Sequence, residues 1–368
     1  MRIVFVHRTQ VDYTVATPFE RALGGTEAGI SYLSVELARL GHAVVVLANP
    51  SAPGHYLGVE CLNCQTAFNA NFLNGADAIV VVNEAIGRGL RDIGVTKPAV
   101  LWTGHVDAQP SMEPLEFSRE RKARNGFAFV SQWQLEQYFG SFWVPREKSR
   151  VMRNAISPMF ATLSPSEPWF KRGEPPILVY TSAPYRGLNV LLQAFPAIRA
   201  AIPGTVLRVY SGLSTTRGGP DDNLYVGLHR QCLATEGVDY VGPISQPALA
   251  EALAGAAALA YPSTYPETSC IAAMEAMAAG AAVLTTGLGA LPETLAGYGT
   301  MIAPREDETA LACDFAAMTI HALNDIRRNP EAAAARREAQ IAHVREHYTW
   351  PKRALDWQRW LFELIVGK

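Results

Sequence analysis

The stretch AALAYPSTYPETSCIAAMEAMAAGAAVLT, residues 257–285, sets a helical segment between two short apolar runs. The runs at 257–261 and 282–285 have the length and composition of buried strands. Between them, good helix formers follow from about Ser269 onward, and Gly280 ends the segment. A strand, a helix and a second strand in this order indicate a parallel sheet covered by helices, so we expect an α/β fold.

Two acidic residues in this stretch point to chemistry. Glu267 follows a proline at the predicted helix start, and Glu275 recurs eight positions later among alanines and methionines. We expect Thr268, Ser269 and Cys270 to offer free backbone N–H groups in the first helical turn, where the helix dipole also favours an anion. A diphosphate could bind there, and a carboxylate at Glu275 could bind ribose hydroxyls.

The same alternation of apolar runs and helical segments extends through the rest of the chain. A proline-rich and charged segment, 157–176, interrupts it and reads as a connector between two lobes. Further strands are expected at 2–7, 43–47, 78–82, 99–102, 127–130, 177–181 and 206–210. The last residues, 349–368, read as an amphipathic helix with three tryptophans, for which we favour core packing over membrane contact.

Composition narrows the class of protein. The chain has 368 residues, 49% of them hydrophobic and 18% charged, which suits two globular lobes and excludes a disordered chain. A formal net charge of -2 gives no argument for a nucleic-acid partner. The first apolar run is too short for a secretory signal or a membrane span, so we expect a cytoplasmic protein. Cys61 and Cys64 form a single CxxC pair without a second pair nearby, so we expect reduced thiols and no zinc site.

The spacing of Glu267 and Glu275 within PETSCIAAMEAMAAG resembles the retaining glycosyltransferases of family four. The resemblance implies the GT-B fold, in which two Rossmann-like α/β/α lobes face each other across a cleft. It gives Glu267 contacts with hydroxyls of the transferred sugar and Glu275 contacts with the ribose. It divides the chain into an acceptor-side lobe at 1–156, a linker at 157–176, a nucleotide-sugar-binding lobe at 177–348 and a C-terminal helix at 349–368 that packs back on the first lobe.

Two further motifs support this resemblance. GGTE, residues 24–27, lies between the first strand and the first helix, and Gly24 and Gly25 would let a diphosphate approach the backbone, with Thr26 near the acceptor. In YTSAPYRGLNVLLQAF, residues 180–195, Arg186 takes the basic position that would stabilise the departing diphosphate. An earlier arginine of the commoner family pattern is replaced by Ser182 and Ala183.

Loop residues complete the expected site. In LWTGHVDAQP, residues 101–110, the resemblance assigns His105 to the donor sugar near its reacting carbon, and Asp107 and Gln109 to the acceptor. It places Gly242 and Ile244 beside the nucleobase. Residues 138–153 combine aromatic and basic side chains, and two interpretations stay open: core packing with a charged loop, which we favour, or contact with a lipid-linked acceptor or a membrane surface.

The expected activity is therefore a hexosyl transfer, with catalytic roles for Glu267, His105 and Arg186. The donor is a nucleotide diphosphate sugar, UDP-linked by preference or GDP-linked. The acceptor is a glycan, a lipid-linked or a small-molecule hydroxyl, as in cell-surface polysaccharide biosynthesis. The chain contains no DxD motif, so we expect no divalent metal and no cofactor. Two alternatives keep the architecture without the transfer: a nucleotide-sugar-binding protein and a nucleotide-sugar epimerase.

Overall fold

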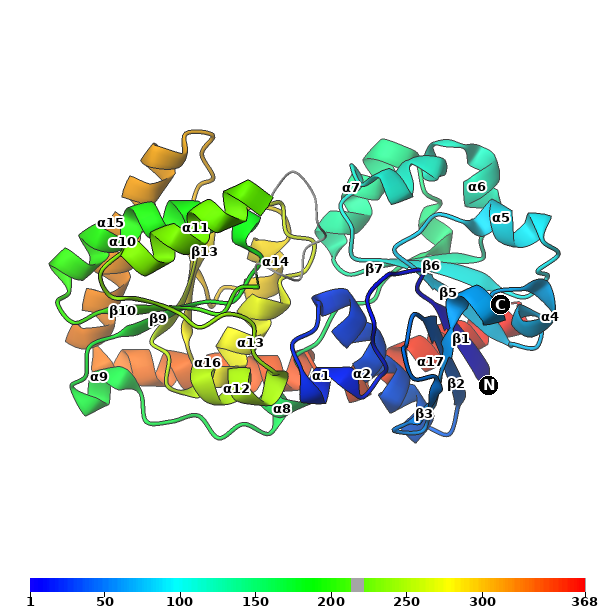
Figure 1. The fold of residues 1–368 in the computed structure, drawn as a ribbon, viewed down its shortest axis with the longest axis horizontal. Coiled ribbons are helices and arrows are strands. Elements are labelled where there is room, and N and C mark those ends of the chain that lie inside the picture. Colours follow the sequence, from blue (N-terminus) through cyan, green and yellow to red (C-terminus); the bar gives the residue numbers. More distant parts are fainter. Residues whose placement is uncertain (213–221, 368) are drawn as a thin grey trace. The chain divides into compact units, whose positions relative to one another are not determined.

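The computed structural model describes residues 1–212 and 222–367. The chain forms two compact units, one from residues 1–158 together with 348–368, the other from residues 159–347. Each unit is built around its own sheet with helices on both faces (Figure 1). Both sheets follow from the predicted apolar runs, because strands buried on both faces need apolar residues at nearly every position.

The first unit has a sheet with the strand order β3-β4-β2-β1-β5-β6-β7-β8. The pairs are parallel except for β3 with β4. The strands are β1 (Arg2–Val6), β2 (Ala43–Ala48), β3 (Gly54–Tyr56), β4 (Val59–Asn63), β5 (Ala78–Val82), β6 (Ala99–Thr103), β7 (Gly126–Phe129) and β8 (Ser149–Val151). The chain leaves β1 toward β2 on one side and places β5 on the other, so a topological switch point lies between β1 and β5.

Helices cover this sheet on both sides. They are α1 (Thr17–Glu20), α2 (Gly25–Arg39), α3 (Cys64–Ala67), α4 (Ala70–Leu73), α5 (Gly87–Asp92), η1 (Pro110–Glu116), α6 (Ser118–Lys122), α7 (Gln132–Phe142), η2 (Arg146–Lys148) and α17 (Trp350–Val366). Successive strand residues point to opposite faces, so Ile3 and Phe5 join one core cluster while Val4 and Val6 join another.

The C-terminal helix α17 completes the core of the first unit. Its buried face carries Trp350, Trp357 and Trp360, which join the cluster formed by β1, β2 and α2. The ring of Trp357 meets that of Trp102 edge-on, with 5.4 Å between centroids. A Cβ on Gly126 would come within 2.5 Å of the Trp360 ring, so a glycine at this position of the strand leaves room for the helix. The last helix is thus a structural part of the first unit.

The second unit has the strand order β11-β10-β9-β12-β13-β14, and all its pairs are parallel. Its strands are β9 (Ile177–Tyr180), β10 (Val206–Val209), β11 (Val238–Tyr240), β12 (Ala258–Tyr261), β13 (Ala282–Thr286) and β14 (Thr300–Ile302). Its helices are α8 (Pro158–Ala161), α9 (Trp169–Arg172), η3 (Pro184–Arg186), α10 (Leu188–Ala201), α11 (Asp222–Ala234), α12 (Gln246–Ala254), α13 (Ile271–Ala279), α14 (Leu291–Leu295), α15 (Glu308–Arg328) and α16 (Pro330–His347). The switch point of this sheet lies between β9 and β12.

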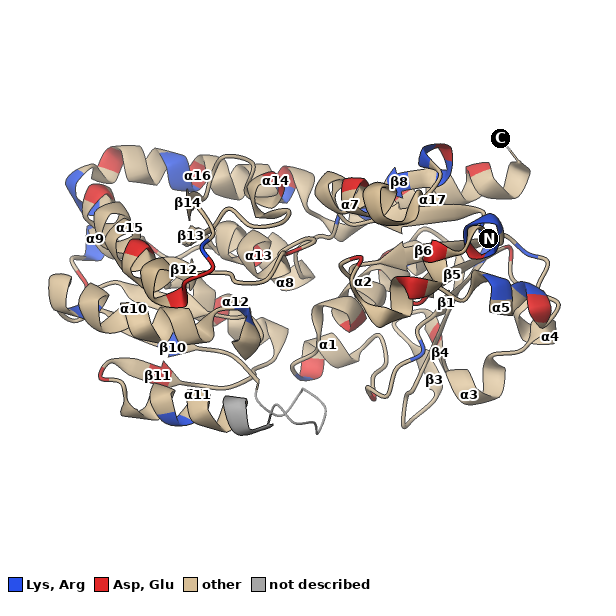
Figure 2. Cartoon of the chain, turned by 90° about the horizontal axis from the view of Figure 1, so that it is seen from above, with Lys and Arg blue, Asp and Glu red and all other residues tan. Residues whose placement is uncertain are grey.

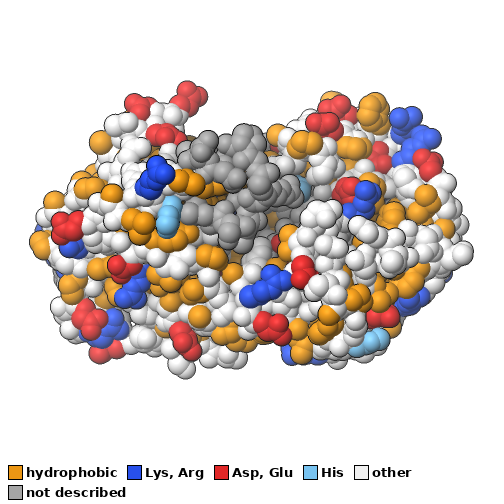
Figure 3. Space-filling model, in the orientation of Figure 1, with side chains coloured by type: hydrophobic (Ala, Val, Ile, Leu, Met, Phe, Trp, Pro, Cys, Tyr) orange, Lys and Arg blue, Asp and Glu red, His pale blue; other side chains and the backbone are white. Residues whose placement is uncertain are grey.

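Charged side chains lie mostly outside the two sheets. Basic and acidic residues alternate along outer helices such as α16 (Figure 2). On the face drawn in Figure 3, lysines and arginines stand among acidic side chains rather than in one continuous basic area. A search of the described helices finds none that is long and apolar enough to cross a lipid bilayer.

The role of α17 yields a first prediction. Trp357→Ala removes a side chain that is 1% exposed and leaves a cavity between α17 and the sheet. We expect the free energy of unfolding of the first unit to fall by about 3–5 kcal/mol. Urea unfolding followed by circular dichroism measures this change. Phe362→Ala on the same helix is the control, because Phe362 is 58% exposed and its loss should change the free energy by less than about 0.5 kcal/mol. Equal effects of the two substitutions would contradict the packing described.

Candidate active site

The candidate site of the second unit lies at its switch point, where the loops after β9 and β12 diverge. The loop after β9 leads into η3 and carries Arg186, and the loop after β12 carries Glu267 just before α13. Loops at the carboxyl ends of parallel strands on either side of a switch point leave an opening for a ligand. Two residues 81 positions apart in sequence, each predicted for the site, therefore come together here.

Arg186 and Glu267 form an ion pair. The Nη1 atom of Arg186 donates a hydrogen bond of 2.7 Å to Oε1 of Glu267. The carboxylate is nearly enclosed, with 5% of its side chain exposed, whereas 28% of the arginine side chain is exposed. Burial alone would lower the pKa of Arg186, but the charge of Glu267 outweighs burial and keeps that pKa above its usual value. The guanidinium is therefore charged, and the arginine still offers donors to a ligand.

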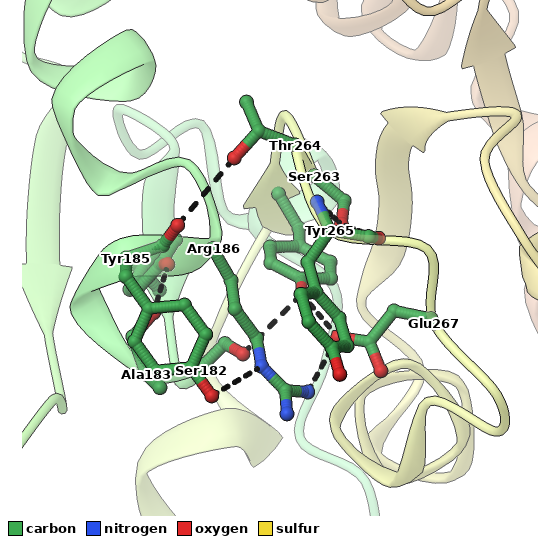
Figure 4. A network of polar contacts seen from close by, with 10 residues as sticks. Ser182, Ala183, Tyr185, Arg186, Ser263, Thr264, Tyr265 and Glu267 are labelled. Atoms are coloured by element: carbon green, nitrogen blue, oxygen red, sulfur yellow. Dashed lines mark hydrogen bonds and ion pairs between the residues drawn. The ribbon is translucent and has the colours of Figure 1, made fainter. Parts of the chain in front are cut away.

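Aromatic side chains surround this pair (Figure 4). The guanidinium of Arg186 lies over the ring of Tyr265, 4.5 Å from its centroid, and Tyr185 contacts it from the other side. The hydroxyl of Tyr261, the last residue of β12, donates to Oε1 of Glu267. Burial, followed by the charge of Glu267, raises the pKa of Tyr261 well above its usual value, so this hydroxyl keeps its proton. The site thus holds its carboxylate with an arginine and a neutral phenol.

The turn before α13 differs from the sequence-based expectation. The helix begins at Ile271 with Cys270 in an extended conformation, so Thr268, Ser269 and Cys270 precede the first helical turn rather than forming it. All three are buried. Within the part of the chain that the structure describes, the Ser269 hydroxyl oxygen has no hydrogen-bond partner. A buried hydroxyl without a partner is a group that a bound ligand could satisfy.

Glu275 lies in the middle of α13. Its side chain is buried, with 4% of the residue exposed. The helix around it consists of alanine, methionine and isoleucine, so a carboxylate there departs from the pattern of a core helix. The expectation that Glu275 is not a solvated surface residue agrees with this burial, and its role in binding ribose stays a prediction.

Two glycines that the sequence analysis did not single out hold the site loops together. Gly289 has a φ of +64°, and a Cβ there would lie 2.5 Å from the carbonyl oxygen of Glu267. The next residue, Ala290, donates its N–H to that same carbonyl at 2.6 Å. Gly187 has a φ of +116°, and a Cβ there would collide with the backbone of Pro262. The sequence signal for Gly289 is the segment GLG directly after β13.

A second group of polar residues gathers at the switch point of the first unit. Asn83 follows β5 and has a φ of +56°, and its carboxamide donates to Thr26 Oγ1 at 3.2 Å while accepting from the N–H of Gly104 at 2.8 Å. His105 follows β6, and its Nδ1 lies 3.1 Å from Ser111 Oγ. The structure thus brings the predicted Thr26 and the loop of the predicted His105 to one place. Asn83, which links them, was missed.

His7 adds a titratable group at this edge. It follows β1, is buried, and its Nδ1 lies 3.0 Å from the hydroxyl of Tyr13. Its Nε2 lies 4.0 Å from a carboxylate oxygen of Glu27. Burial and then the neighbouring His105 lower the pKa of His7 to about 4. The imidazole is therefore neutral at physiological pH and can act as a hydrogen-bond donor and acceptor.

The remaining predicted site residues lie on loops and helix starts of both units. Gly25 starts α2, and Gly24 before it has an ordinary extended backbone, where an added Cβ would collide with the Glu27 carboxylate. Asp107 accepts a hydrogen bond from Ser141 on α7, and Gln109 directly precedes η1. In the second unit, Gly242 and Ile244 follow the edge strand β11, where Gly242 donates its N–H to Val209.

The segment 138–153 has both buried and exposed aromatic side chains. Tyr138 and Phe142 pack in the core, whereas Trp143 is 75% exposed.

Cys61 and Cys64 are free and buried, and burial raises the pKa of both thiols. Among residues 1–212 and 222–367, no three histidine, cysteine or acidic side chains are grouped so as to hold a metal ion.

The contact between Gly289 and Glu267 can be tested. Gly289→Ala places a methyl group against the Glu267 backbone at a φ that L side chains rarely adopt, so we expect the free energy of unfolding of the second unit to fall by about 1–3 kcal/mol. Gly287→Ala is the matched control, because its φ is not positive and the nearest atom would be 3.8 Å away. Urea unfolding of both variants measures the difference. A loss at Gly287 as large as at Gly289 would contradict this account.

Comparisons with known proteins agree with this geometry. Residues 166–334 match the family described as Glycosyl transferases group 1. No curated protein matches the chain by sequence. Among solved structures, the sucrose-phosphate synthase from Thermosynechococcus elongatus aligns over 100% of both chains, with a TM-score of 0.73 and 19% sequence identity. HepE from Anabaena, in complex with UDP-glucose, also aligns over 100% of both chains, with a TM-score of 0.69 and 18% identity.

A third solved structure, WaaG, described as a glycosyltransferase involved in lipopolysaccharide biosynthesis, covers 96% of this chain and 98% of its own, with a TM-score of 0.64 and 18% identity. Similarity at this level of identity shows a shared fold, and the match over 166–334 shows the class of domain. The predicted fold class and the predicted enzyme class are confirmed. The chain is a glycosyltransferase with the GT-B fold, and residues 166–334, within its second unit, match the glycosyl transferases group 1 family.

Proposed function

We propose that the protein is a retaining, metal-independent glycosyltransferase that moves a hexose from a nucleotide diphosphate to a hydroxyl of a glycan, a lipid-linked acceptor or a small molecule. The observation that carries this proposal is the Arg186–Glu267 pair at the switch point of the second unit, directly before the N-terminus of α13. This arrangement offers one cationic group, one anionic group and a helix N-terminus to a single ligand. A sugar diphosphate needs all three.

UDP is the nucleotide that we favour. HepE from Anabaena, which shares the fold, has been solved with UDP and with UDP-glucose. In the second unit, we assign Glu275 to the ribose, because it is the buried carboxylate about one turn into α13. We assign Gly242 and Ile244, after the edge strand β11, to the nucleobase. GDP is the alternative nucleotide, and a binding assay has to distinguish it from UDP.

The chemical step breaks the bond between the anomeric carbon and the diphosphate oxygen. Negative charge then grows on the diphosphate, and the guanidinium of Arg186 together with the N–H groups of the Thr268–Cys270 turn and the start of α13 would stabilise it. The acceptor oxygen forms the new bond on the same face of the sugar, and its proton passes to the departing phosphate oxygen. The configuration at the anomeric carbon is thereby retained.

Glu267 would hold the transferred sugar during this step. Both hydrogen bonds that it accepts in the described residues, from Arg186 and Tyr261, end on Oε1. Oε2 is therefore left for sugar hydroxyls, and a carboxylate accepts from two neighbouring hydroxyls with little strain. The buried negative charge also favours the positive character that develops at the sugar carbon.

The residues at the switch point of the first unit have proposed roles as well. We assign His105 to the donor sugar, Gly24 and Gly25 to the diphosphate, and Thr26, Asp107 and Gln109 to the acceptor. The bonds that Asn83 makes to Thr26 and to Gly104 support a shared role, because they fix the two loops with respect to each other. We propose that this chemistry takes place in the cytoplasm, and at the inner face of the membrane when the acceptor is lipid-linked.

Replacing Glu267 tests the site directly. Glu267→Gln keeps the shape of the side chain but removes the charge, so we expect kcat for transfer from UDP-glucose to fall at least about 10-fold, since a charged hydrogen bond contributes roughly 2 kcal/mol. The assay measures product formation with UDP-glucose and with GDP-glucose, and NMR of the product shows its anomeric configuration.

Glu251→Gln on α12 is the matched control, because Glu251 is exposed and should leave kcat unchanged. Unchanged turnover in the Glu267 variant would refute the site assignment. An inverted product would refute the retaining mechanism. Binding of UDP-glucose without transfer to any acceptor would instead indicate a binding protein, and interconversion of donor sugars without an acceptor would indicate an epimerase.

Chelation tests the proposed independence from metal. Since Arg186 and backbone N–H groups would supply the positive charge at the diphosphate, we expect the initial rate to stay the same after dialysis against EDTA. Added Mg²⁺ or Mn²⁺ should not raise it. The control is the enzyme dialysed in the same buffer without EDTA, assayed by direct detection of the product. A rate that falls on chelation and returns with Mn²⁺ would show that a metal takes part.

A further inference from the structure

The second unit contains a pocket at the edge of its sheet opposite to the candidate active site. It lies where β12, β13 and β14 begin, whereas the site loops follow the ends of β9 and β12. Its volume is about 140 Å³, and a cavity of about 150 Å³ is large enough for one benzene molecule. All the residues that line it belong to the second unit. The pocket can therefore hold one ring-sized apolar group without any contribution from the first unit.

Small residues create this space. Alanines and glycines line the pocket at the ends of α12 and α13 and at the starts of the strands that follow: Ala254, Gly255, Ala256, Ala257, Gly280 and Ala282. Side chains in a protein interior normally fill such positions to near close packing. Here each side chain has one carbon atom or none, so a hollow remains that the lining residues of α9, α15 and α16 do not fill.

Aromatic side chains line other parts of the pocket. Trp169 and Phe170 belong to α9, and their ring centroids lie 6.0 Å apart. Tyr298 lies just before β14. Trp169 is buried, and the guanidinium of Arg327 lies over its ring, 5.0 Å from the centroid. Aromatic side chains bind other aromatic rings edge-on or offset, so this lining favours a ligand that carries an aromatic ring.

A cation accompanies the apolar lining. Arg337, on α16, is half-buried, and its Nε and Nη2 atoms donate to the carbonyl oxygens of Gly280 at 3.0 Å and Ser166 at 2.8 Å. Within the described residues, its Nη1 atom makes no hydrogen bond and no carboxylate bonds to the side chain. Burial lowers the pKa of Arg337, the charge of Glu338 opposes this effect, and the charge of Arg172 adds to it. A half-buried guanidinium that bonds only to carbonyl groups gains from an anionic ligand.

Two acidic residues also line the pocket and oppose an anion. Glu167 and Asp325 are exposed, as is the second basic residue of the lining, Arg336. Water and salt screen exposed charges, so these three residues act only weakly on a ligand. Arg337 is less exposed, and its charge is therefore the one that decides which sign of ligand charge the pocket favours.

We propose that this pocket binds a small aromatic carboxylic acid, with its ring against Trp169 and Tyr298 and its carboxylate on Arg337. The ring would fill the hollow left by the small residues, and the carboxylate would accept a hydrogen bond from Nη1. The ligand would lie at the C-terminal end of α13, because Arg337 holds the carbonyl of Gly280, which ends that helix. The donor site is at the other end of α13, a helix of nine residues that is roughly 14 Å long. This inference does not depend on the proposed function.

The test measures the affinities of four probes for the full chain by ligand-observed NMR titration: benzoate, benzyl alcohol, benzylamine and acetate. We expect benzoate to bind at least about tenfold more tightly than benzyl alcohol, because a charged hydrogen bond is added to the same ring. Benzylamine has the opposite charge and acetate lacks the ring, so both should bind more weakly than benzoate. Saturating UDP should leave benzoate bound, since the two sites lie at opposite ends of α13.

Two variants test the two parts of the pocket. Arg337→Gln removes the charge, so it should weaken benzoate binding at least about tenfold and leave benzyl alcohol binding unchanged. Ala254→Leu extends a side chain into the hollow, so it should weaken the binding of both ring probes at least about tenfold. Arg328→Gln and Ala234→Leu are the matched controls, because both residues are exposed and lie outside the pocket. Circular dichroism checks the fold of every variant.

Three results would overturn the proposal: benzoate binding no tighter than that of benzyl alcohol or benzylamine, displacement of benzoate by UDP, or benzoate binding that Ala254→Leu leaves unchanged. Arg337 also bonds to the backbone, so its replacement could disturb the whole pocket and weaken both ring probes equally. In that case the order of the four affinities on the unaltered chain and the Ala254→Leu result decide between the outcomes.

Discussion

The Glu267 carboxylate is almost entirely buried, and the neighbouring residues of the candidate site compensate for this burial with an opposite charge and hydrogen bonds. A buried carboxylate without partners costs several kcal/mol, so its position requires neighbours that remain in place. Arg186 supplies an opposite charge and Tyr261 a phenolic proton. Gly289 lets the next loop approach the backbone of Glu267 closely enough for Ala290 to bond to it. Three strands of one sheet thus converge on a single carboxylate.

The two sheets each have a switch point, but the loops at the two switch points present different side chains. In the second unit, the loops after β9 and β12 present full charges, which suit a ligand that is itself highly charged. In the first unit, the loops after β1, β5 and β6 present a neutral imidazole, a carboxamide and hydroxyls. The loops after β1 and β5 also carry the ion pair of Arg8 and Glu84, so this edge combines neutral and charged groups.

Much of the fold was predictable because buried parallel strands must be apolar at nearly every position, as β5 (AIVVV) is. The strands β3, β4, β8, β11 and β14 were not predicted. Only two of the five residues of β4 are buried, and each of the other four strands has three residues that are not all buried. In the site, Glu267 and Arg186 stood out because their residue types are unusual in their places. Tyr261 looked like the end of a strand and Gly289 like an ordinary turn. Their importance depends on what another loop brings against them, which no local pattern encodes.

The start of α13 shows the same limit at smaller scale. Helix propensity placed it near Ser269, yet the helix begins at Ile271, because the extended backbone at Cys270 ends the preceding turn. Propensity describes what a segment prefers on its own. Here the segment also holds Glu267 beside Arg186, and the observed helix starts two residues later than its propensity alone places it.

The return of α17 to the first unit makes residues 159–347 an insertion within it. The order in which the two units can complete their folds during synthesis follows from this. The second unit has its complete sequence before α17 leaves the ribosome, whereas the first unit waits for Trp350, Trp357 and Trp360 to close its core. Until then, the apolar face of α2 and its neighbouring strands lacks its cover. The half of the protein that comes first in sequence is therefore the half whose core is completed last.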